Sequence, residues 1–369
     1  MGYKKGMVTS KELDEIITKG KLKYLILLGQ RSNGKSYSAK HLAVQKAYNN
    51  NELFIYLRRR KEDIADYLTD TYFNDLNVTE ITEGVYNSIS VYRKGIYLAN
   101  TDDDGNVTRG LLVGYVRSLN QAERYKSGAY SRVKYILYEE FVTEGTYLTN
   151  EVDKLDSFVS TVLRMENGCI ILIGNTISRV CPYYREYGLS NIRKQKQGTV
   201  DLYKKTGKDE NGESVEINIG VFLTGSVEGV SKMFFRKSAG MINRGEWFTN
   251  EQPHLVGNLD DYSIIHTVVY VMGDNTFLCR LLSGYKNAFG VIWYITPKTT
   301  DIKENTRIVS RKQATGGIWS RDFRSPVTKD ESVAFDLLLR GYVAFADNLT
   351  GTEFYQCLKN DGMGARIDG

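Results

Sequence analysis

One short stretch limits the folds open to this chain more than any other, because an apolar run leads directly into a glycine-rich loop. Residues 25–36 read Leu-Ile-Leu-Leu-Gly-Gln-Arg-Ser-Asn-Gly-Lys-Ser and match the pattern G-x-x-x-x-G-K-[ST] at every fixed position. In such a loop the glycines let backbone N–H groups point at phosphate oxygens, the lysine reaches the β- and γ-phosphates, and the hydroxyl binds Mg²⁺. The predicted phosphate-binding residues are Gly29, Gly34, Lys35 and Ser36, and Ser36 is also the predicted metal ligand.

The residues on both sides of this loop fit a strand, loop and helix in that order. Residues 24–28 are apolar like a buried strand, and residues 35–49 have the composition of a helix. The positive end of that helix would face the same phosphates. The alternative is a glycine-rich loop without a ligand, which this context disfavours.

Length and composition indicate a globular protein of about two domains. The chain has 369 residues, of which 25% are charged and 41% hydrophobic, and its apolar runs are far too short to cross a bilayer. Its four scattered cysteines and three histidines argue against a zinc site or a disulfide framework, and they fit a reducing cytoplasm. The net charge of +5 is compatible with a nucleic-acid partner.

A pair of acids follows a later apolar run. Residues 133–138 read as a buried strand, and Glu139 and Glu140 come directly after it. Paired acids of this kind are typical of the second half of a nucleotide site, where one carboxylate holds Mg²⁺ through water and the next polarises the attacking water. The usual order is Asp-Glu, so the longer side chain of Glu139 moves its carboxylate outward. The alternative is that both acids are simply exposed at a strand end.

Two further strand ends carry candidate residues. Residues 169–173 are apolar and lead into Gly174-Asn175-Thr176, the position where additional-strand ATPases place a γ-phosphate sensor; an ordinary turn is the alternative. Residues 53–57 run into four successive cations, and ligands gather at the carboxyl ends of parallel strands. These cations could contact a DNA backbone or be the solvated start of a helix. They are Arg58, Arg59, Arg60 and Lys61.

The pattern changes after the first two hundred residues, which indicates separate segments. Residues 1–200 form the expected phosphate-loop domain, residues 201–258 a linker or lid with a polar hairpin, and residues 259–369 a second α/β domain. In this last domain we expect strands at 264–272, 276–282, 289–296 and 306–311, then a helix at 332–345 and a loose tail.

Together with 54–61, 124–127 and 161–164, these motifs resemble the genome-packaging ATPases of small podophages with protein-primed linear genomes. That family is similar to the motor half of large terminases. The resemblance implies an additional-strand (ASCE) P-loop fold that uses ATP and Mg²⁺, followed by an RNase H-like domain. Because residues 263–272 carry no acid, this second domain would be a degenerate, non-cutting nuclease fold.

The resemblance also implies how such a chain works and what it binds. Family members assemble as a homopentameric ring at the portal vertex of an empty procapsid in the host cytoplasm, in some members on a ring of packaging RNA. The ring drives double-stranded DNA inward on ATP hydrolysis. We therefore expect contacts with DNA, portal and procapsid, no membrane, and absence from the mature virion.

Specific roles follow by position from the resemblance. Glu139 takes the place of the usual Walker B aspartate, and Glu140 that of the catalytic glutamate. Arg164 matches an arginine finger given to a neighbouring subunit, although on residue chemistry alone it would be a cation that serves a helix dipole. The remaining assignments are Lys126 as a second trans-acting cation, Lys61 as a DNA-gripping lysine, Asn175 in the coupling motif, and Arg31 and Asn33 as further nucleotide contacts.

Other P-loop functions compete with this interpretation. A helicase or a plasmid-partition ATPase would share the same motifs. A nucleotide switch is disfavoured by the paired acids and by the lack of an N-K-x-D element, and a small-molecule kinase is disfavoured by the length of the chain. Stimulation of ATP hydrolysis by DNA would separate the packaging motor and the other nucleic-acid ATPases from the nucleotide switch and the small-molecule kinase.

Overall fold

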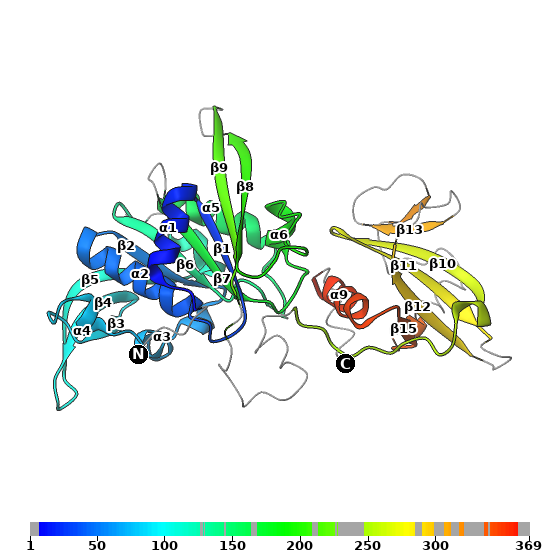
Figure 1. Ribbon diagram of the computed structural model, residues 1–369, viewed down its shortest axis with the longest axis horizontal. Coiled ribbons are helices and arrows are strands. Elements are labelled where there is room, and N and C mark those ends of the chain that lie inside the picture. Colours follow the sequence, from blue (N-terminus) through cyan, green and yellow to red (C-terminus); the bar gives the residue numbers. More distant parts are fainter. Residues whose placement is uncertain are drawn as a thin grey trace. The chain divides into compact units, whose positions relative to one another are not determined.

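The computed structural model divides the chain into two compact units, and each is described here by itself. The first comprises residues 1–143, 147–177 and 181–248, and the second comprises residues 144–146, 178–180 and 249–369 (Figure 1). Within these units the structure describes residues 7–125, 128, 130–143, 145–163, 168–208, 213–225, 227, 247–284, 290–298, 306–310, 317–320, 336–338 and 340–360.

The first unit is built on a sheet of nine strands within the described residues, in the order β3-β4-β5-β2-β6-β7-β1-β9-β8. Strands β5, β2, β6, β7, β1 and β9 run parallel, and antiparallel pairs close both edges. Strand β7 therefore lies between β1 and β6, the two strands that lead into the glycine-rich loop and the acidic pair. The strands are β1 Tyr24–Gly29, β2 Leu53–Arg58, β3 Ser88–Tyr92, β4 Gly95–Thr101, β5 Val107–Ser118, β6 Val133–Glu139, β7 Cys169–Asn175, β8 Thr199–Lys208 and β9 Ser214–Leu223.

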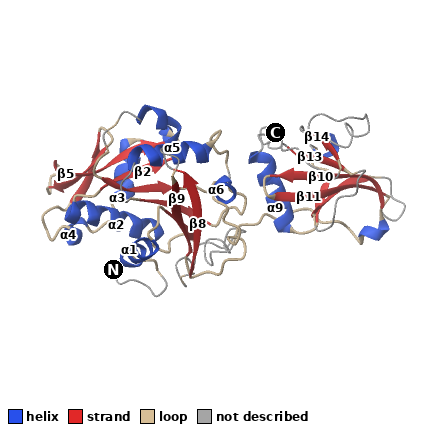
Figure 2. Cartoon of the chain, turned by 90° about the horizontal axis from the view of Figure 1, so that it is seen from above, coloured by secondary structure: helices blue, strands red, loops and turns tan. Residues whose placement is uncertain are grey.

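Helices cover both faces of this sheet. Every residue of β1 is buried, which is the pattern of a parallel strand with helices on both sides. One apolar core joins the sheet to α1 (Ser10–Gly20), α2 (Lys35–Asn50), α3 (Asp66–Phe73) and α4 (Val78–Ile81). A second core, on the opposite face, joins it to α5 (Glu151–Leu163) and α6 (Pro182–Glu186) (Figure 2). Two short 3₁₀ helices, η1 (Lys61–Ile64) and η2 (Leu119–Tyr125), follow β2 and β5.

Local sequence signals predicted most of this unit. The strands expected at 24–28, 53–57, 133–138 and 169–173 and the helix expected at 35–49 are confirmed within one or two residues at each end. Thr9 caps α1, since its hydroxyl accepts the N–H of Glu12 at 3.1 Å. Residues 102–106 form the turn between β4 and β5, where the N–H of Asp102 donates to the Asn106 carbonyl at 3.1 Å.

The expected linker at 201–258 differs from the structure in its first part. Residues 201–208 and 214–223 lie in β8 and β9, and β9 pairs in parallel with β1, Tyr24 opposite Ile219. The outer half of this hairpin is polar and exposed, and this composition is why the sequence predicted a linker. The inner half of β9 is buried within the sheet, so the phosphate-loop unit extends past residue 200.

The second unit has a sheet of six strands among its described residues, in the order β14-β13-β10-β11-β12-β15. Strands β10, β11 and β12 are antiparallel, whereas β13, β14 and β15 join in parallel. The sheet packs its apolar face against α9 (Asn348–Leu358) through residues such as Trp293 and Phe354. The strands are β10 Ser263–Met272, β11 Asn275–Ser283, β12 Val291–Pro297, β13 Arg307–Ser310, β14 Ile318–Ser320 and β15 Val343–Phe345.

The prediction for the end of the chain was wrong in two places. The helix expected at 332–345 fails at its C-terminal part, because Gly341 takes a φ of +77° and residues 343–345 form β15 beside β12. Residues 348–358, expected in a loose tail, form α9. Asp347 caps this helix by accepting the N–H of Thr350 at 2.7 Å. In the parts of the chain that the structure describes, no helix is both long and apolar enough to cross a membrane.

Candidate active site

The candidate residues meet because three parallel strands end at one edge of the sheet. Gly29 lies opposite Asn175 in the β1–β7 register, and Glu139 lies opposite Ile173 in the β6–β7 register. The glycine-rich loop at 30–34 follows β1 at this edge and leads into α2. The topology thus brings together the loop, the first acid and the strand-end asparagine.

The loop backbone has the conformation expected of a phosphate cradle. Gly29, Ser32 and Gly34 have φ angles of +154°, +59° and +88°. A Cβ atom on Gly29 would lie 1.8 Å from the hydroxyl oxygen of Thr224, so only glycine fits there. Gly34 caps the N-terminus of α2 without a side-chain hydrogen bond, which leaves the positive end of α2 available to an anion. These features fit the phosphates of a nucleotide.

Lys35 is folded back onto the loop. Its side-chain nitrogen donates to the carbonyl of Gly29 at 3.2 Å, to that of Gln30, and to the Asn33 and Asn175 side-chain oxygens at 3.0 and 3.2 Å. The residue is 5% exposed, and burial lowers the pKa of Lys35 to about 7 against the opposing effect of Glu139. A lysine ringed by acceptors in this way is poised to transfer its contacts to phosphate oxygens.

Glu139 and Ser36 form the part of the site that fits Mg²⁺. Glu139 is buried, and burial raises its pKa, whereas hydrogen bonds from Tyr72 and Ser36 lower it. The Tyr72 hydroxyl donates to one Glu139 oxygen. A serine hydroxyl beside a carboxylate at the end of the phosphate loop is a suitable donor set for Mg²⁺, which takes few protein oxygens and keeps water ligands.

Glu140 differs from Glu139 in both backbone and surroundings. Its φ is +56°, in the left-handed region that costs a non-glycine residue roughly 1–2 kcal/mol. Its carboxylate is exposed and accepts a hydrogen bond from the Arg58 guanidinium at 2.6 Å. The side chain expected to polarise water is therefore held by an arginine in this state.

The four predicted DNA-contacting cations are placed very differently from one another. Arg58 is partly buried and paired with Glu140, and Arg59 is 7% exposed with its guanidinium on Glu151. Arg60 and Lys61 are exposed at the start of η1. The interior position of Arg59 differs from the solvent-facing phosphate contact that the sequence predicted.

Other predicted residues are found in the loop or outside the described residues. Arg31 is exposed on the loop, whereas Asn33 is fully buried and donates its amide to the Thr224 hydroxyl. Lys126 and Arg164 lie outside the described residues, so their expected trans-acting roles stay predictions.

Sequence reasoning missed two sets of residues that shape the site. Gln30 exchanges two hydrogen bonds with the backbone of Val227, at 3.1 and 3.2 Å, and Thr224 holds Asn33. Tyr72 lies on α3 and reaches Glu139. No short motif marks these residues, because each acts on a partner far away in the sequence.

Comparison with known families gives a match over more than half of the chain. The model of the Podovirus DNA encapsidation protein (Gp16) family matches residues 11–205. The chain is 32% identical over 167 residues to a DNA packaging protein of Bacillus phage B103, covering 44% of this chain and 47% of that protein. It is 30% identical over 167 residues to the DNA packaging protein of Bacillus phage phi29, covering 44% and 46%. The chain thus spans about half the length of the curated relatives it matches.

A solved structure resembles the whole chain in fold. A chain of the bacteriophage Phi-29 viral genome packaging motor assembly aligns with a TM-score of 0.53 and 18% identity, covering 96% of this chain and 98% of that one. At this identity the likeness concerns the fold.

Proposed function

The chain belongs to the Podovirus DNA encapsidation protein (Gp16) family, and on this premise we propose that it is an ATP-hydrolysing motor that moves double-stranded viral DNA into a preformed procapsid. One observation carries the proposal: the phosphate loop, the Ser36–Glu139 pair and Asn175 converge at one sheet edge. This convergence supplies phosphate contacts, a metal-binding pair and a candidate γ-phosphate sensor.

The residues of the loop would bind and orient ATP. Backbone N–H groups of the loop and the start of α2 would face the phosphates, and Lys35, now on the Gly29 and Asn33 oxygens, would exchange them for β- and γ-phosphate oxygens. Ser36 and Glu139 would hold Mg²⁺, which neutralises charge on those oxygens. Asn175, which now accepts from Lys35, would be released to face the γ-phosphate.

Glu140 would act on the attacking water after it leaves Arg58. In this structure the 2.6 Å contact with Arg58 occupies the carboxylate that must accept or orient the water proton. A DNA phosphate that attracts Arg58 would compete with Glu140 for the guanidinium. The same contact would then link DNA binding to hydrolysis.

The strand orders support the finer fold assignments. Strand β7 between β1 and β6 supports the additional-strand class. In the second unit, antiparallel β12-β11-β10 followed by parallel β13 and β14 supports an RNase H-like arrangement. Asp336 is exposed and pairs with Arg340 at 2.8 Å, Asp274 follows β10, and Asp301 lies outside the described residues. We therefore expect this unit not to cut DNA.

The names of the relatives point to the partners of this chain. Proteins called DNA packaging proteins, and a motor assembly for viral genome packaging, support viral DNA as a partner, and the family resemblance adds the portal of a procapsid. On the resemblance to packaging ATPases of small podophages, we also propose a homo-oligomeric, pentameric ring, with packaging RNA as a further partner. Such a ring would work in the host cytoplasm, at the portal vertex.

The test is ATP hydrolysis by the wild type and Glu140→Gln, with and without double-stranded DNA and portal-bearing procapsids. We expect DNA and procapsids to stimulate the wild type, and Glu140→Gln to bind ATP but lose about 10²–10⁴-fold in rate. Glu216→Gln, which changes an exposed glutamate of β9, is the matched control and should behave like the wild type. Turnover indifferent to DNA and procapsids would contradict the motor. Strand separation without packaging would favour a helicase.

A further inference from the structure

A buried ion pair between Arg59 and Glu151 contacts the backbone of Glu140, the proposed catalytic glutamate. Arg59 follows β2, and its Nε donates to both carboxylate oxygens of Glu151, at 3.1 and 2.9 Å. Both side chains are nearly inaccessible, at 9% and 1% exposure. Although burial disfavours the charge, the facing Tyr138 and Glu151 hold the pKa of Arg59 above its ordinary value. Arg59 therefore stays a cation in the interior, where it cannot meet a DNA phosphate.

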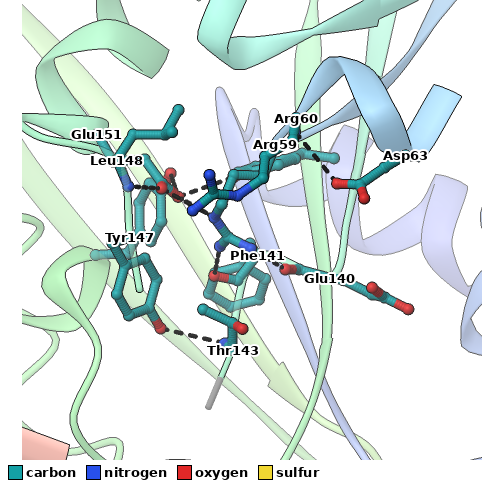
Figure 3. A network of polar contacts seen from close by, with 11 residues as sticks. Arg59, Arg60, Asp63, Glu140, Phe141, Thr143, Tyr147, Leu148 and Glu151 are labelled. Carbon is teal, nitrogen blue, oxygen red and sulfur yellow. Dashed lines mark hydrogen bonds and ion pairs between the residues drawn. The ribbon is translucent and has the colours of Figure 1, made fainter. Parts of the chain in front are cut away.

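The other end of the same guanidinium binds the backbone around Glu140. One terminal nitrogen of Arg59 donates to the Glu140 carbonyl at 3.0 Å, and the other donates to the Phe141 carbonyl at 2.7 Å (Figure 3). Glu140 is a residue with a φ of +56°, and such a conformation persists only where the surroundings fix it. Arg59 provides that fixation. Arg58 holds the side chain of Glu140, and Arg59 holds its backbone.

Glu151 is in turn fixed by a full set of donors. Besides Arg59, its carboxylate accepts the hydroxyls of Tyr138 and Tyr183, both at 2.8 Å, and the N–H of Leu148 at 2.7 Å. Glu151 is the first residue of α5, and Tyr138 precedes Glu139 on β6. The network therefore joins the end of β2, the end of β6 and the start of α5, and each charge has a partner.

We propose that Arg59 and Glu151 are positioning residues for ATP hydrolysis. Glu151 orients the guanidinium, and Arg59 holds the Glu140 backbone so that the carboxylate, once released by Arg58, points at the attacking water. This inference rests on the proposed function. It assigns to Arg59 a role in the hydrolysis step in place of the DNA contact that the cationic run predicted.

The main test compares Arg59→Lys with the wild type. Lysine keeps the charge beside Glu151. Its single nitrogen, however, cannot replace the three nitrogens of the planar guanidinium, which bond to Glu151 and to two carbonyl oxygens at once. We expect kcat to fall by about ten- to a hundredfold, because small displacements of a catalytic group have effects of this size. The affinity for a fluorescent ATP analogue should stay within about twofold, since the phosphate loop is untouched. Lys46→Met, which breaks a partly buried ion pair with Asp14 in the same unit, is the control for stability and should keep the wild-type kcat.

A second, more conservative variant keeps the proposal testable if Arg59→Lys does not fold. Tyr183→Phe removes one hydroxyl donor from Glu151 and keeps the buried ring, so it should fold and lower kcat about threefold at unchanged nucleotide affinity. Wild-type kcat in both Arg59→Lys and Tyr183→Phe would overturn the proposal. So would parallel losses of kcat, nucleotide affinity and melting temperature, which indicate a merely structural pair. If Arg59→Lys does not fold, Tyr183→Phe alone decides.

These outcomes are distinguishable from failure of the proposed function. A wild type that hydrolyses no ATP, even with DNA and procapsids, refutes the motor itself. A wild type with stimulated hydrolysis and an unaffected Arg59→Lys refutes only the positioning role.

Discussion

The protonation of Lys35 should depend on whether a nucleotide is bound. This lysine is buried among oxygen acceptors, and burial lowers its pKa to about 7. With this lowered pKa, we expect Lys35 to bind a proton less firmly at pH 8 before nucleotide binds than an exposed lysine does. Phosphates favour the charged form, so their arrival should raise the pKa again.

The expected consequence is proton uptake upon nucleotide binding. At pH 8, ADP should draw close to one proton from the buffer, and its affinity should fall by up to about tenfold per pH unit between pH 7 and 9. Calorimetric titration with ADP and EDTA, in two buffers of different ionisation enthalpy, measures the uptake directly. Lys35→Met should abolish it, and Lys19→Met, on the exposed surface of α1, should not. Binding at pH 8 without proton uptake in the wild type would contradict the lowered pKa.

The cationic run shows why single residues resist assignment from sequence. Four successive cations after a strand predicted either a DNA contact or the solvated start of a helix for all four, yet neighbouring residues at a strand end point to opposite sides. Arg58 reaches Glu140, whereas Arg59 turns inward to Glu151. Because Glu151 lies 92 positions away along the chain, no local sequence pattern predicts that it is the buried partner of Arg59.

At the scale of elements, the end of β9 forms a clamp on the phosphate loop. The Thr224 N–H donates to the Leu28 carbonyl at 2.8 Å, its hydroxyl accepts the Asn33 amide, and Val227 exchanges hydrogen bonds with Gln30. Thr224 and Asn33 are almost fully buried. The segment after β9 therefore fixes the loop that must bind phosphates.

Thr224→Val should loosen this clamp while keeping its shape. The buried Asn33 amide would lose its acceptor, at a cost of about 1–3 kcal/mol. The loop should relax to give this amide another partner, so nucleotide affinity should weaken by roughly five- to a hundredfold. Titration of a fluorescent ATP analogue measures the change. Thr206→Val, at an exposed position of β8, is the matched control and should bind like the wild type. Equal affinities for the two variants would mean that the clamp does not support the loop.

The elements themselves divide into those that local sequence predicts and those that it does not. The strand–loop–helix around the phosphate loop and the strand before Glu139 were predictable, because apolar runs and glycines mark them within a few residues. The pairing of β9 with β1 was not, since its partner lies almost two hundred positions away. The error at 332–345 has the same origin: β15 is only three residues long and is held by β12 rather than by its own pattern.

At the scale of the whole molecule, we expect a neighbouring subunit to supply a further cation that neutralises charge on the transferred phosphoryl group, in addition to Lys35. The resemblance to packaging ATPases assigns that role to Arg164, which directly follows the last described residue of α5, Leu163. In a ring, an arginine supplied by a neighbour would make each site depend on two subunits. Such a residue is worth about 10³–10⁵ in rate, because it neutralises charge that develops in the transition state.

Mixing two inactive variants tests this dependence. Arg164→Ala keeps an intact loop, and Lys35→Ala keeps an intact arginine. Alone, each should lose nearly all ATP hydrolysis on procapsids. In equimolar mixed rings, about a quarter of the sites would combine an intact loop with a neighbour's intact arginine, so hydrolysis should recover to at most about a quarter of the wild-type rate. Mixing Arg164→Ala with the Arg164→Ala/Lys35→Ala double variant supplies no arginine and should recover nothing. A mixture no more active than the sum of its two components, in rings shown to contain both, would mean that Arg164 acts within its own chain or only as the helix-dipole cation that its residue chemistry alone suggests.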